Sequence, residues 1–197
     1  MTHSEACEVL IAEISSRWQI PPADLANLST FFDLKTIKKN EYYFRSGAVL
    51  NEAIFIARGC LKQYTLSEDG NERIIFFAEE NWWAGELASM RAQVPTKYNL
   101  VALEDSILLT LSVDKWAYAY THLPWFAEMY HSGQQCRVKS LEDQLLRSLS
   151  ESVETRYLRL LNERPLLLQR VSQYHVAAFL GVSPEALSRV RKRLYNV

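Results

Sequence analysis

Cysteine and histidine are scarce in this sequence, and the few that occur are scattered. The cysteines are Cys7, Cys60 and Cys136, an odd number with no Cys-x-x-Cys spacing. This arrangement supports neither a disulfide framework nor a closed zinc site. The histidines are equally dispersed, at positions His3, His122, His131 and His175. Because metal ligands converge in clusters, we expect these to be ordinary histidines and expect no metal site.

Long apolar runs are also lacking. No uninterrupted apolar segment approaches the roughly 18 residues that a membrane-spanning helix needs. The N-terminus has no charged start followed by an apolar run, the pattern typical of a secretory signal. We therefore expect no membrane partner and a cytoplasmic location.

Charge is nearly balanced over the whole chain but unevenly placed along it. Residues 153–197 carry eight basic and three acidic side chains, whereas residues 1–152 carry 14 basic and 20 acidic ones. A basic C-terminal module attached to an acidic one favours contact with a polyanion at the C-terminal end.

Short apolar or alternating runs fill the middle of the chain, after a helical pattern over residues 5–32 that Pro21 and Pro22 interrupt. Turn residues separate the runs, and the Asp69-Gly70 pair is a hairpin signal. Close spacing of this kind predicts an antiparallel barrel or roll beneath a helical cap. The expected strands are Leu34–Lys38, Tyr42–Phe44, Ala53–Arg58, Cys60–Leu66, Arg73–Ala78, Tyr98–Ala102 and Ser106–Ser112.

The pattern turns helical after Asp114. A long helix is predicted from Pro124 to about Leu149, with Val138, Leu141 and Leu145 at heptad spacing. Pairing with a second copy of the chain would bury this stripe, and the alternative is that the helix packs on the barrel alone. A further helix through Asn162, ended by Pro165, follows a module boundary near Ser150.

Residues 172–194 predict two short helices joined by a turn. Ser172 can cap the first helix, and Gly181 can take a positive φ just beyond its end. Ser183 can cap the second helix, with Pro184 at its first position. The expected apolar faces are Val176, Ala177, Phe179 and Leu180, and then Leu187, Val190 and Leu194. This pattern indicates a helix-turn-helix.

The polar face of the second helix could read DNA. Glu185 can accept a hydrogen bond from cytosine N4, and Arg189, one turn later, can donate twice to guanine. The alternative is an exposed ion pair with no partner outside the chain. Residues 191–193 extend the positive charge toward backbone phosphates. The candidate DNA-binding residues are Ser183, Pro184, Glu185, Ser188, Arg189, Lys192 and Arg193.

In this order of elements, the chain resembles the Crp/Fnr family of bacterial transcription regulators. The motifs that carry the resemblance are Gly47 and Gly59 at turns, Gly85-Glu86-Leu87, the run from Ala102 to Ser106, and the run from Gly181 to Arg189. The short length and the Tyr- and Trp-rich roll resemble effector-uncharacterised members from the Bacteroidetes group. The resemblance implies an α+β fold with a helical cap and β-roll (1–123), a dimerisation helix (124–149) and a helix-turn-helix domain (150–197). The roll would be a double-stranded β-helix, or jelly roll, with antiparallel strands.

The family's ligand site is only half matched. In its cyclic-nucleotide-binding members, a Gly-Glu pair holds phosphate and ribose, and an Arg-Ser pair completes the phosphate site. Gly85 and Glu86 match the first pair, but Thr96 and Lys97 occupy the arginine and serine positions. Lys97 offsets charge without offering a bidentate fork. A different small ligand, or none, is therefore expected in place of a cyclic nucleotide, at the candidate residues Gly85, Glu86, Leu87, Thr96 and Lys97.

Other departures bear on sensing and on DNA contacts. Only Cys7 lies near the N-terminus, so an iron–sulfur cluster is not expected. Residues 40–110 contain no histidine to ligate a haem.

The family normally adds a small β-hairpin, the wing, after the recognition helix, whereas this chain stops at Val197, so we expect a truncated or absent wing. Pro184 replaces an arginine that is frequent in the family.

The resulting hypothesis is a homodimeric transcription regulator that reads a palindromic DNA site, with an unknown small-molecule effector and RNA polymerase as further partners. We expect no enzymatic activity and no resident cofactor. One alternative is a cyclic-nucleotide-binding or other ligand-binding dimer that has lost DNA binding. A cupin-like metalloenzyme is disfavoured, because residues 34–112 contain no histidine.

Overall fold

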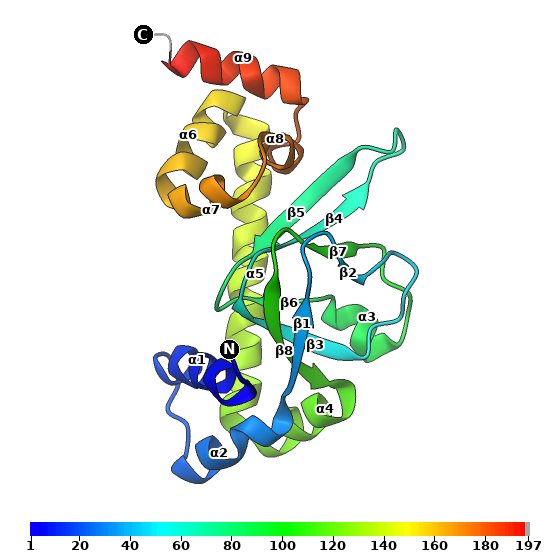
Figure 1. The fold of residues 1–197 in the computed structure, drawn as a ribbon, viewed down its shortest axis with the longest axis vertical. Helices are drawn as coiled ribbons and strands as arrows, with labels where there is room; N and C mark the ends of the chain where they lie inside the picture. Colours follow the sequence, from blue (N-terminus) through cyan, green and yellow to red (C-terminus); the bar gives the residue numbers. More distant parts are fainter. Residues whose placement is uncertain (196–197) are drawn as a thin grey trace. The chain divides into compact units, whose positions relative to one another are not determined.

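The protein combines helices with antiparallel sheet, and a computed structural model describes residues 1–195 (Figure 1). The strands are β1 (Asp33–Ile37), β2 (Tyr42–Phe44), β3 (Glu52–Arg58), β4 (Leu61–Leu66), β5 (Glu72–Ala78), β6 (Trp83–Ala84), β7 (Asn99–Ala102) and β8 (Ser106–Ser112). The helices are α1 (His3–Ser15), α2 (Pro22–Asn27), the 3₁₀ turn η1 (Leu28–Phe31), α3 (Leu87–Ala92), α4 (Val113–His122), α5 (Pro124–Ser150), α6 (Val153–Glu163), α7 (Pro165–Arg170), α8 (Gln173–Leu180) and α9 (Pro184–Tyr195).

The strands form two four-stranded sheets, in the orders β1-β8-β3-β6 and β2-β7-β4-β5. In the first sheet β8 is central. Leu109 pairs with Leu34 on β1 and with Phe55 on β3, both antiparallel. Leu109 and Phe55 are fully buried. Strands with this much burial account for the apolar runs in the sequence, and they make up the core of the roll.

Gly59, between β3 and β4, shows why that turn requires glycine. It has φ +115°, and a Cβ added there would lie 2.1 Å from the Ser106 side-chain oxygen and 2.8 Å from the Ser106 Cα. The Gly59 N–H donates to Glu80 at 2.8 Å. A side chain would therefore clash with backbone as well as adopt a strained φ.

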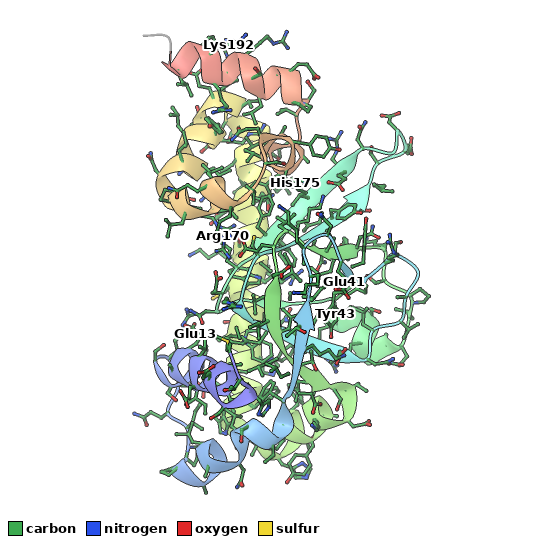
Figure 2. All side chains as sticks on the ribbon, viewed as in Figure 1. Glu13, Glu41, Tyr43, Arg170, His175 and Lys192 are labelled. Atoms are coloured by element: carbon green, nitrogen blue, oxygen red, sulfur yellow. The ribbon has the colours of Figure 1, made fainter. Side chains whose placement is uncertain are left out.

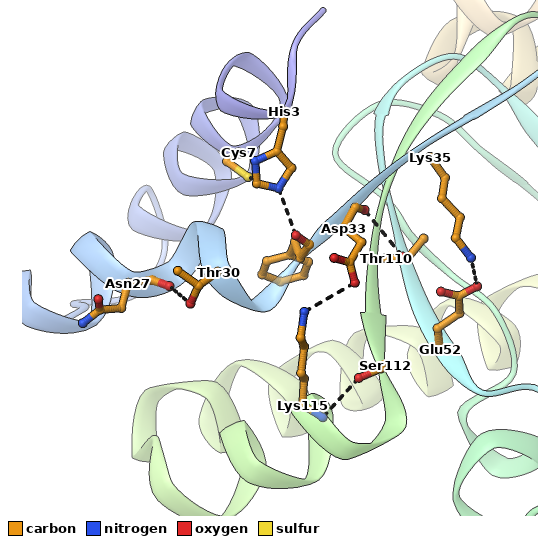
Figure 3. Close-up of polar contacts among 11 residues, drawn as sticks. His3, Cys7, Asn27, Thr30, Asp33, Lys35, Glu52, Thr110, Ser112 and Lys115 are labelled. Carbon is orange, nitrogen blue, oxygen red and sulfur yellow. Dashed lines mark hydrogen bonds and ion pairs between the residues drawn. The ribbon is translucent and has the colours of Figure 1, made fainter.

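Helix α1 is capped at its N-terminus and contacts the segment before β1 through His3. Thr2 and Glu5 form a reciprocal capping box at its first turn. The imidazole Nε2 of His3 lies 2.9 Å from the carbonyl oxygen of Phe32, just before β1 (Figure 3). The Lys115 ammonium of α4 lies 3.4 Å from Asp33 Oδ2 on β1, and Figure 3 marks this ion pair with a dashed line. Helices α1 and α4 are thus both linked by polar contacts to the start of β1.

A polar cluster links the strands β1, β2 and β3. Glu52 accepts hydrogen bonds from the Lys35 ammonium (Figure 3) and from the Tyr43 hydroxyl. Burial by itself raises the pKa of Glu52, but the hydrogen bonds from Lys35, Tyr43 and Thr110 outweigh it and the net pKa lies below the ordinary value. Glu52 is thus held as a carboxylate at neutral pH.

The internal contacts divide the chain into two compact units. The first comprises residues 1–63 and 77–133, and the second comprises residues 64–76 and 134–197. The second unit therefore includes the tip of the β4–β5 hairpin together with the later part of α5 and the C-terminal helices.

The C-terminal helices begin where the sequence offers caps. The Ser152 hydroxyl accepts from the Thr155 N–H at 3.1 Å, and the Ser172 hydroxyl accepts from the His175 N–H at 3.3 Å. Two features depart from the sequence-based expectations. Pro165 ends α6 as predicted but also occupies the first position of α7, which the sequence analysis did not anticipate. The two-residue strand β6 was not predicted either, because two residues show no periodicity.

Candidate functional site

Helices α8 and α9 meet through a three-residue turn with the geometry expected from its sequence. Gly181 has φ 71° and ψ 28°, the left-handed conformation that glycine adopts without strain. The N–H of Val182 donates to the carbonyl of Ala177 at 3.0 Å, which closes α8. The Ser183 hydroxyl then accepts from the Ala186 N–H at 3.2 Å and caps α9. The turn thereby fixes the direction in which α9 leaves α8.

The two sides of α9 differ in burial. Leu187 and Val190 are buried, with exposed fractions of 1% and 5%. The side chains predicted to face DNA at the start of the helix are all exposed, namely Ser183, Pro184, Glu185, Ser188 and Arg189. The helix thus presents one continuous polar face beside an apolar one.

Glu185 is held as a carboxylate on this face. Its own backbone N–H and the Ser183 hydroxyl donate hydrogen bonds to it, and Arg189 contributes positive charge, so the pKa of Glu185 lies below its ordinary value. A carboxylate and a guanidinium one turn apart offer acceptor and donor groups side by side. This pair is suited to hydrogen-bonding the edges of bases.

The basic residues at the end of α9 differ in their contacts. Lys192 and Arg193 are exposed, and Figure 2 labels Lys192 on this helix. Arg193 Nη2 lies 3.5 Å from Glu154 Oε2, so part of its charge is offset by α6. Arg156, also on α6, donates to the carbonyl oxygen of Leu180 at 3.0 Å and so satisfies the end of α8. The expectation of a truncated wing concerns residues after Tyr195, which lie outside the described residues.

The candidate ligand residues of the roll come together only in part. Gly85 has φ +106°, and Glu86 precedes the six-residue helix α3, which starts at Leu87. The Thr96 hydroxyl, from the segment before β7, donates to Glu86 Oε2 at 2.5 Å and accepts from the Tyr98 N–H at 3.2 Å. Thr96 is 2% exposed. Glu86 and Thr96 are therefore partners of each other in this structure.

Lys97 has a different environment from Thr96. Its side chain is exposed, with the ammonium 5.6 Å from the ring centroid of Tyr98. It is thus the member of the candidate set most accessible to an anion in solution.

Gln63 on β4 is a buried polar residue that the sequence analysis missed. It is 0% exposed, and neither its amide nitrogen nor its amide oxygen has a hydrogen-bond partner. A buried amide without partners costs on the order of 1–3 kcal/mol. A glutamine inside a predicted strand is the available signal, but alternation alone assigns such a residue to the outer face.

A pocket of about 180 Å³ lies within the second unit and was also missed. Its wall combines the hairpin tip with α8, the turn and the start of α9. The lining residues are Asn71, Glu72, Arg73, Tyr174, Ala178, Gly181, Val182, Ser183 and Pro184. The Asp69-Gly70 signal predicted the hairpin, but no local pattern could place its tip against another segment.

The heptad stripe of α5 is uncovered within the chain. Val138, Leu141 and Leu145 are 54%, 44% and 59% exposed, and Leu149 is 77% exposed. Earlier in the same helix Trp125, Phe126 and Met129 are buried. Within α5, the exposed apolar side chains therefore lie along the later part of the helix.

Within residues 1–195, no group of three or more His, Cys, Asp or Glu side chains is placed to hold a metal ion. In the same part of the chain, every helix is too short or too polar to span a bilayer.

Part of the sequence matches a known family model. Residues 34–121 match the family model of the cyclic nucleotide-binding domain. The sequence has no match among curated proteins.

Solved structures share the fold over most of the chain. FixK2 from Bradyrhizobium japonicum has a TM-score of 0.74 and 16% identity, with 84% of this chain and 85% of that chain covered. The c-di-GMP responsive global regulator CLP from Xanthomonas campestris has a TM-score of 0.70 and 18% identity, with coverage of 88% and 91%. The Thermus thermophilus catabolite activator protein has a TM-score of 0.56 and 21% identity, with coverage of 93% and 87%. At identities this low, the matches show the fold alone. They confirm the predicted α+β class with a roll, a long helix and C-terminal helices.

Proposed function

We propose that this protein is a sequence-specific DNA-binding transcription regulator of the Crp/Fnr type. In this proposal residues 1–123 form the cap and sensing roll, residues 124–149 the dimerisation helix, and residues 150–197 the DNA-reading domain. The similarity of most of the chain to the global regulator CLP supports this assignment at the level of fold.

One observation carries the proposal. Helix α9 buries Leu187 and Val190 and leaves Glu185, Ser188 and Arg189 exposed on its first turns. In a helix-turn-helix, the N-terminal residues of the second helix reach base edges in the major groove. Arg189 then donates to guanine, and Glu185 accepts from cytosine. Lys192 and Arg193 contact phosphates and contribute the salt dependence.

Dimerisation follows from the uncovered stripe on α5. Two copies that pair along Val138, Leu141 and Leu145 bury apolar side chains that the monomer leaves in water. A two-fold dimer places its recognition helices about 34 Å apart, one DNA turn, and so reads a palindromic site.

The roll supplies the regulatory input. Its match to the cyclic nucleotide-binding domain supports a small-molecule effector near Glu86, Thr96 and Lys97. A cyclic nucleotide is not favoured, because Thr96 replaces the arginine of the resembled site and already pairs with Glu86. Lys97 favours a ligand with negative charge.

The test starts with selection of binding sites from randomised DNA by the full-length protein. Affinity for the selected site is then measured by gel shift at two salt concentrations. Arg189→Ala is expected to cost about 1–3 kcal/mol and to relax specificity at one base position. Lys192→Ala is expected to weaken all sequences alike and to lower the salt slope by about one unit.

Arg17→Ala is the matched control, because Arg17 is an exposed arginine beyond α1 in the first unit. Unchanged site preference in Arg189→Ala would show that α9 does not read bases. If selection enriched no sequence at low salt, the alternative of a ligand-binding dimer without DNA binding would replace this proposal.

A further inference from the structure

The tip of the β4–β5 hairpin is an ordered, acidic element. The Ser67 N–H donates to the Asn71 carbonyl at 2.9 Å, and the Gly70 N–H donates to the Ser67 carbonyl at 2.9 Å. The Ser67 hydroxyl also accepts from the Asn71 N–H at 3.2 Å. Residues 67–73 carry three carboxylates, Glu68, Asp69 and Glu72, against the single cation Arg73. The turn is therefore well defined and has a net charge of −2.

The hairpin belongs to the same compact unit as the C-terminal helices. Its tip residues Asn71, Glu72 and Arg73 form one wall of the 180 Å³ pocket whose other wall is α8 and the start of α9. On β5, the Phe76 ring lies under the Arg137 guanidinium of α5, 4.9 Å from the ring centroid. The hairpin thus contacts α5 through Phe76 and faces α8 and the start of α9 across the pocket at its tip.

The residues opposite the tip are those that DNA would have to approach. In a helix-turn-helix complex the first helix crosses the phosphate backbone and the second enters the groove by its N-terminus. Tyr174 near the start of α8 is 50% exposed, and Ser183 and Pro184 begin α9. All three line the pocket with the hairpin. A phosphate backbone and the hairpin tip cannot occupy this surface together.

Charge reinforces the steric conflict. Glu68 and Asp69 are exposed at the tip. Carboxylates within about 10 Å of a phosphate backbone repel it at moderate ionic strength, because screening is incomplete over that distance. The tip therefore opposes DNA by repulsion as well as by volume.

We propose that the β4–β5 hairpin tip is an autoinhibitory element that stands across a pocket from the turn between α8 and α9 of its own chain and must move away before DNA binds. This inference rests on the proposed DNA-binding function. It adds a second surface through which an effector or partner could control the protein, at Asn71–Arg73.

A reversible cross-link tests directly whether the hairpin tip lies beside α8. Asn71→Cys and Tyr174→Cys are combined in a Cys136→Ser background, since Cys136 is the exposed native cysteine and Cys7 and Cys60 are buried. Mild oxidation is expected to form an intramolecular disulfide, and DNA is expected to slow its formation. The control pair is Asn71→Cys with Lys192→Cys, because Lys192 is exposed on α9 but does not line the pocket.

The oxidised protein is expected to lose at least about tenfold in affinity for the selected site, equal to about 1.4 kcal/mol, and to regain it on reduction. Equal cross-linking of the two pairs, a cross-linked dimer, or full DNA binding by the oxidised protein would each overturn the inference. The cross-linking rates remain informative even if the protein binds no DNA, so failure of the proposed function is distinguishable from failure of this contact.

Removing the tip charge gives a second measurement that needs no cross-link. Glu68→Gln with Asp69→Asn keeps a turn-forming Asn-Gly pair and is expected to tighten DNA binding several-fold at low salt. Glu8→Gln with Glu128→Gln removes the same charge from exposed helix positions of the first unit. If both variants gained equally, only net charge would matter and the tip would have no specific role.

Discussion

The Thr96 hydroxyl donates a 2.5 Å hydrogen bond to Oε2 of Glu86, across the ten residues that contain α3. In the resembled cyclic-nucleotide site these two positions hold an arginine and a glutamate that face the ligand. Here the counterparts, Thr96 and Glu86, are hydrogen-bonded to each other, so the Glu86 carboxylate has a protein partner in this part of the roll.

Thr96→Val is therefore expected to destabilise the protein by about 1–3 kcal/mol. Valine matches threonine in shape but leaves Glu86 and the Tyr98 N–H without the shared hydroxyl. Urea unfolding measures the loss. Thr30→Val serves as control, because the Thr30 hydroxyl is exposed and bonds only a nearby carbonyl. Equal stability of the two variants would mean that the Glu86–Thr96 pair contributes nothing.

Gln63→Leu is expected to raise the free energy of unfolding by about 1 kcal/mol, because it replaces a fully buried amide without partners by an apolar side chain of similar size. Thermal unfolding at fixed pH reports the gain. Gln19→Leu, at an exposed position, should give none. A clear loss of stability in Gln63→Leu would contradict this account of the roll interior.

Acidification is expected to weaken the link between β1, β2 and β3. The pKa of Glu52 is depressed in the folded state, so its stabilising contribution is present above the unfolded-state pKa of about 4.3 and is lost as the pH falls through the folded value. Glu52→Gln should flatten this part of the stability profile, measured by urea unfolding between pH 6 and pH 3. An unchanged slope would show that Glu52 does not drive the acid response.

If two copies pair along α5 as proposed, Leu145→Asp is expected to give a monomer where the unchanged protein gives a dimer, because it places a carboxylate in the centre of the uncovered stripe. Ser140→Asp adds the same charge to an exposed position of that helix away from the stripe and should leave the dimer intact. Light scattering during gel filtration gives the mass of each variant. If both variants ran as dimers, the interface would not include the stripe on α5.

The strands and the C-terminal helices could be predicted because their signals are local. Short apolar runs indicated β3 and β8, and the Ser183-Pro184 start indicated α9. Pro165 shows the limit of such signals, since proline both ends one helix and begins the next, and only the backbone distinguishes the cases. The sequence therefore predicted a break at Pro165 but not α7.

The candidate sites could be predicted less completely because they depend on contacts between distant segments. Glu86 was recognised from its neighbours Gly85 and Leu87. Nothing local indicated that the Thr96 hydroxyl would donate a hydrogen bond to the Glu86 carboxylate. The hairpin tip was likewise predicted as a turn, and its position beside Tyr174 follows only from tertiary packing. No local pattern indicated that Gln63 would be buried, and the fold buries it completely.

The division between the two units falls inside a single helix, α5, directly after Gly133. Nothing lies within 4 Å of the place where a Cβ would sit on this residue. Glycine in a helix interior lowers the cost of local unwinding by about 0.5–1 kcal/mol relative to alanine. Helix α5 is consequently easier to unwind at Gly133, the residue where the two compact units divide, than it would be with alanine at that position.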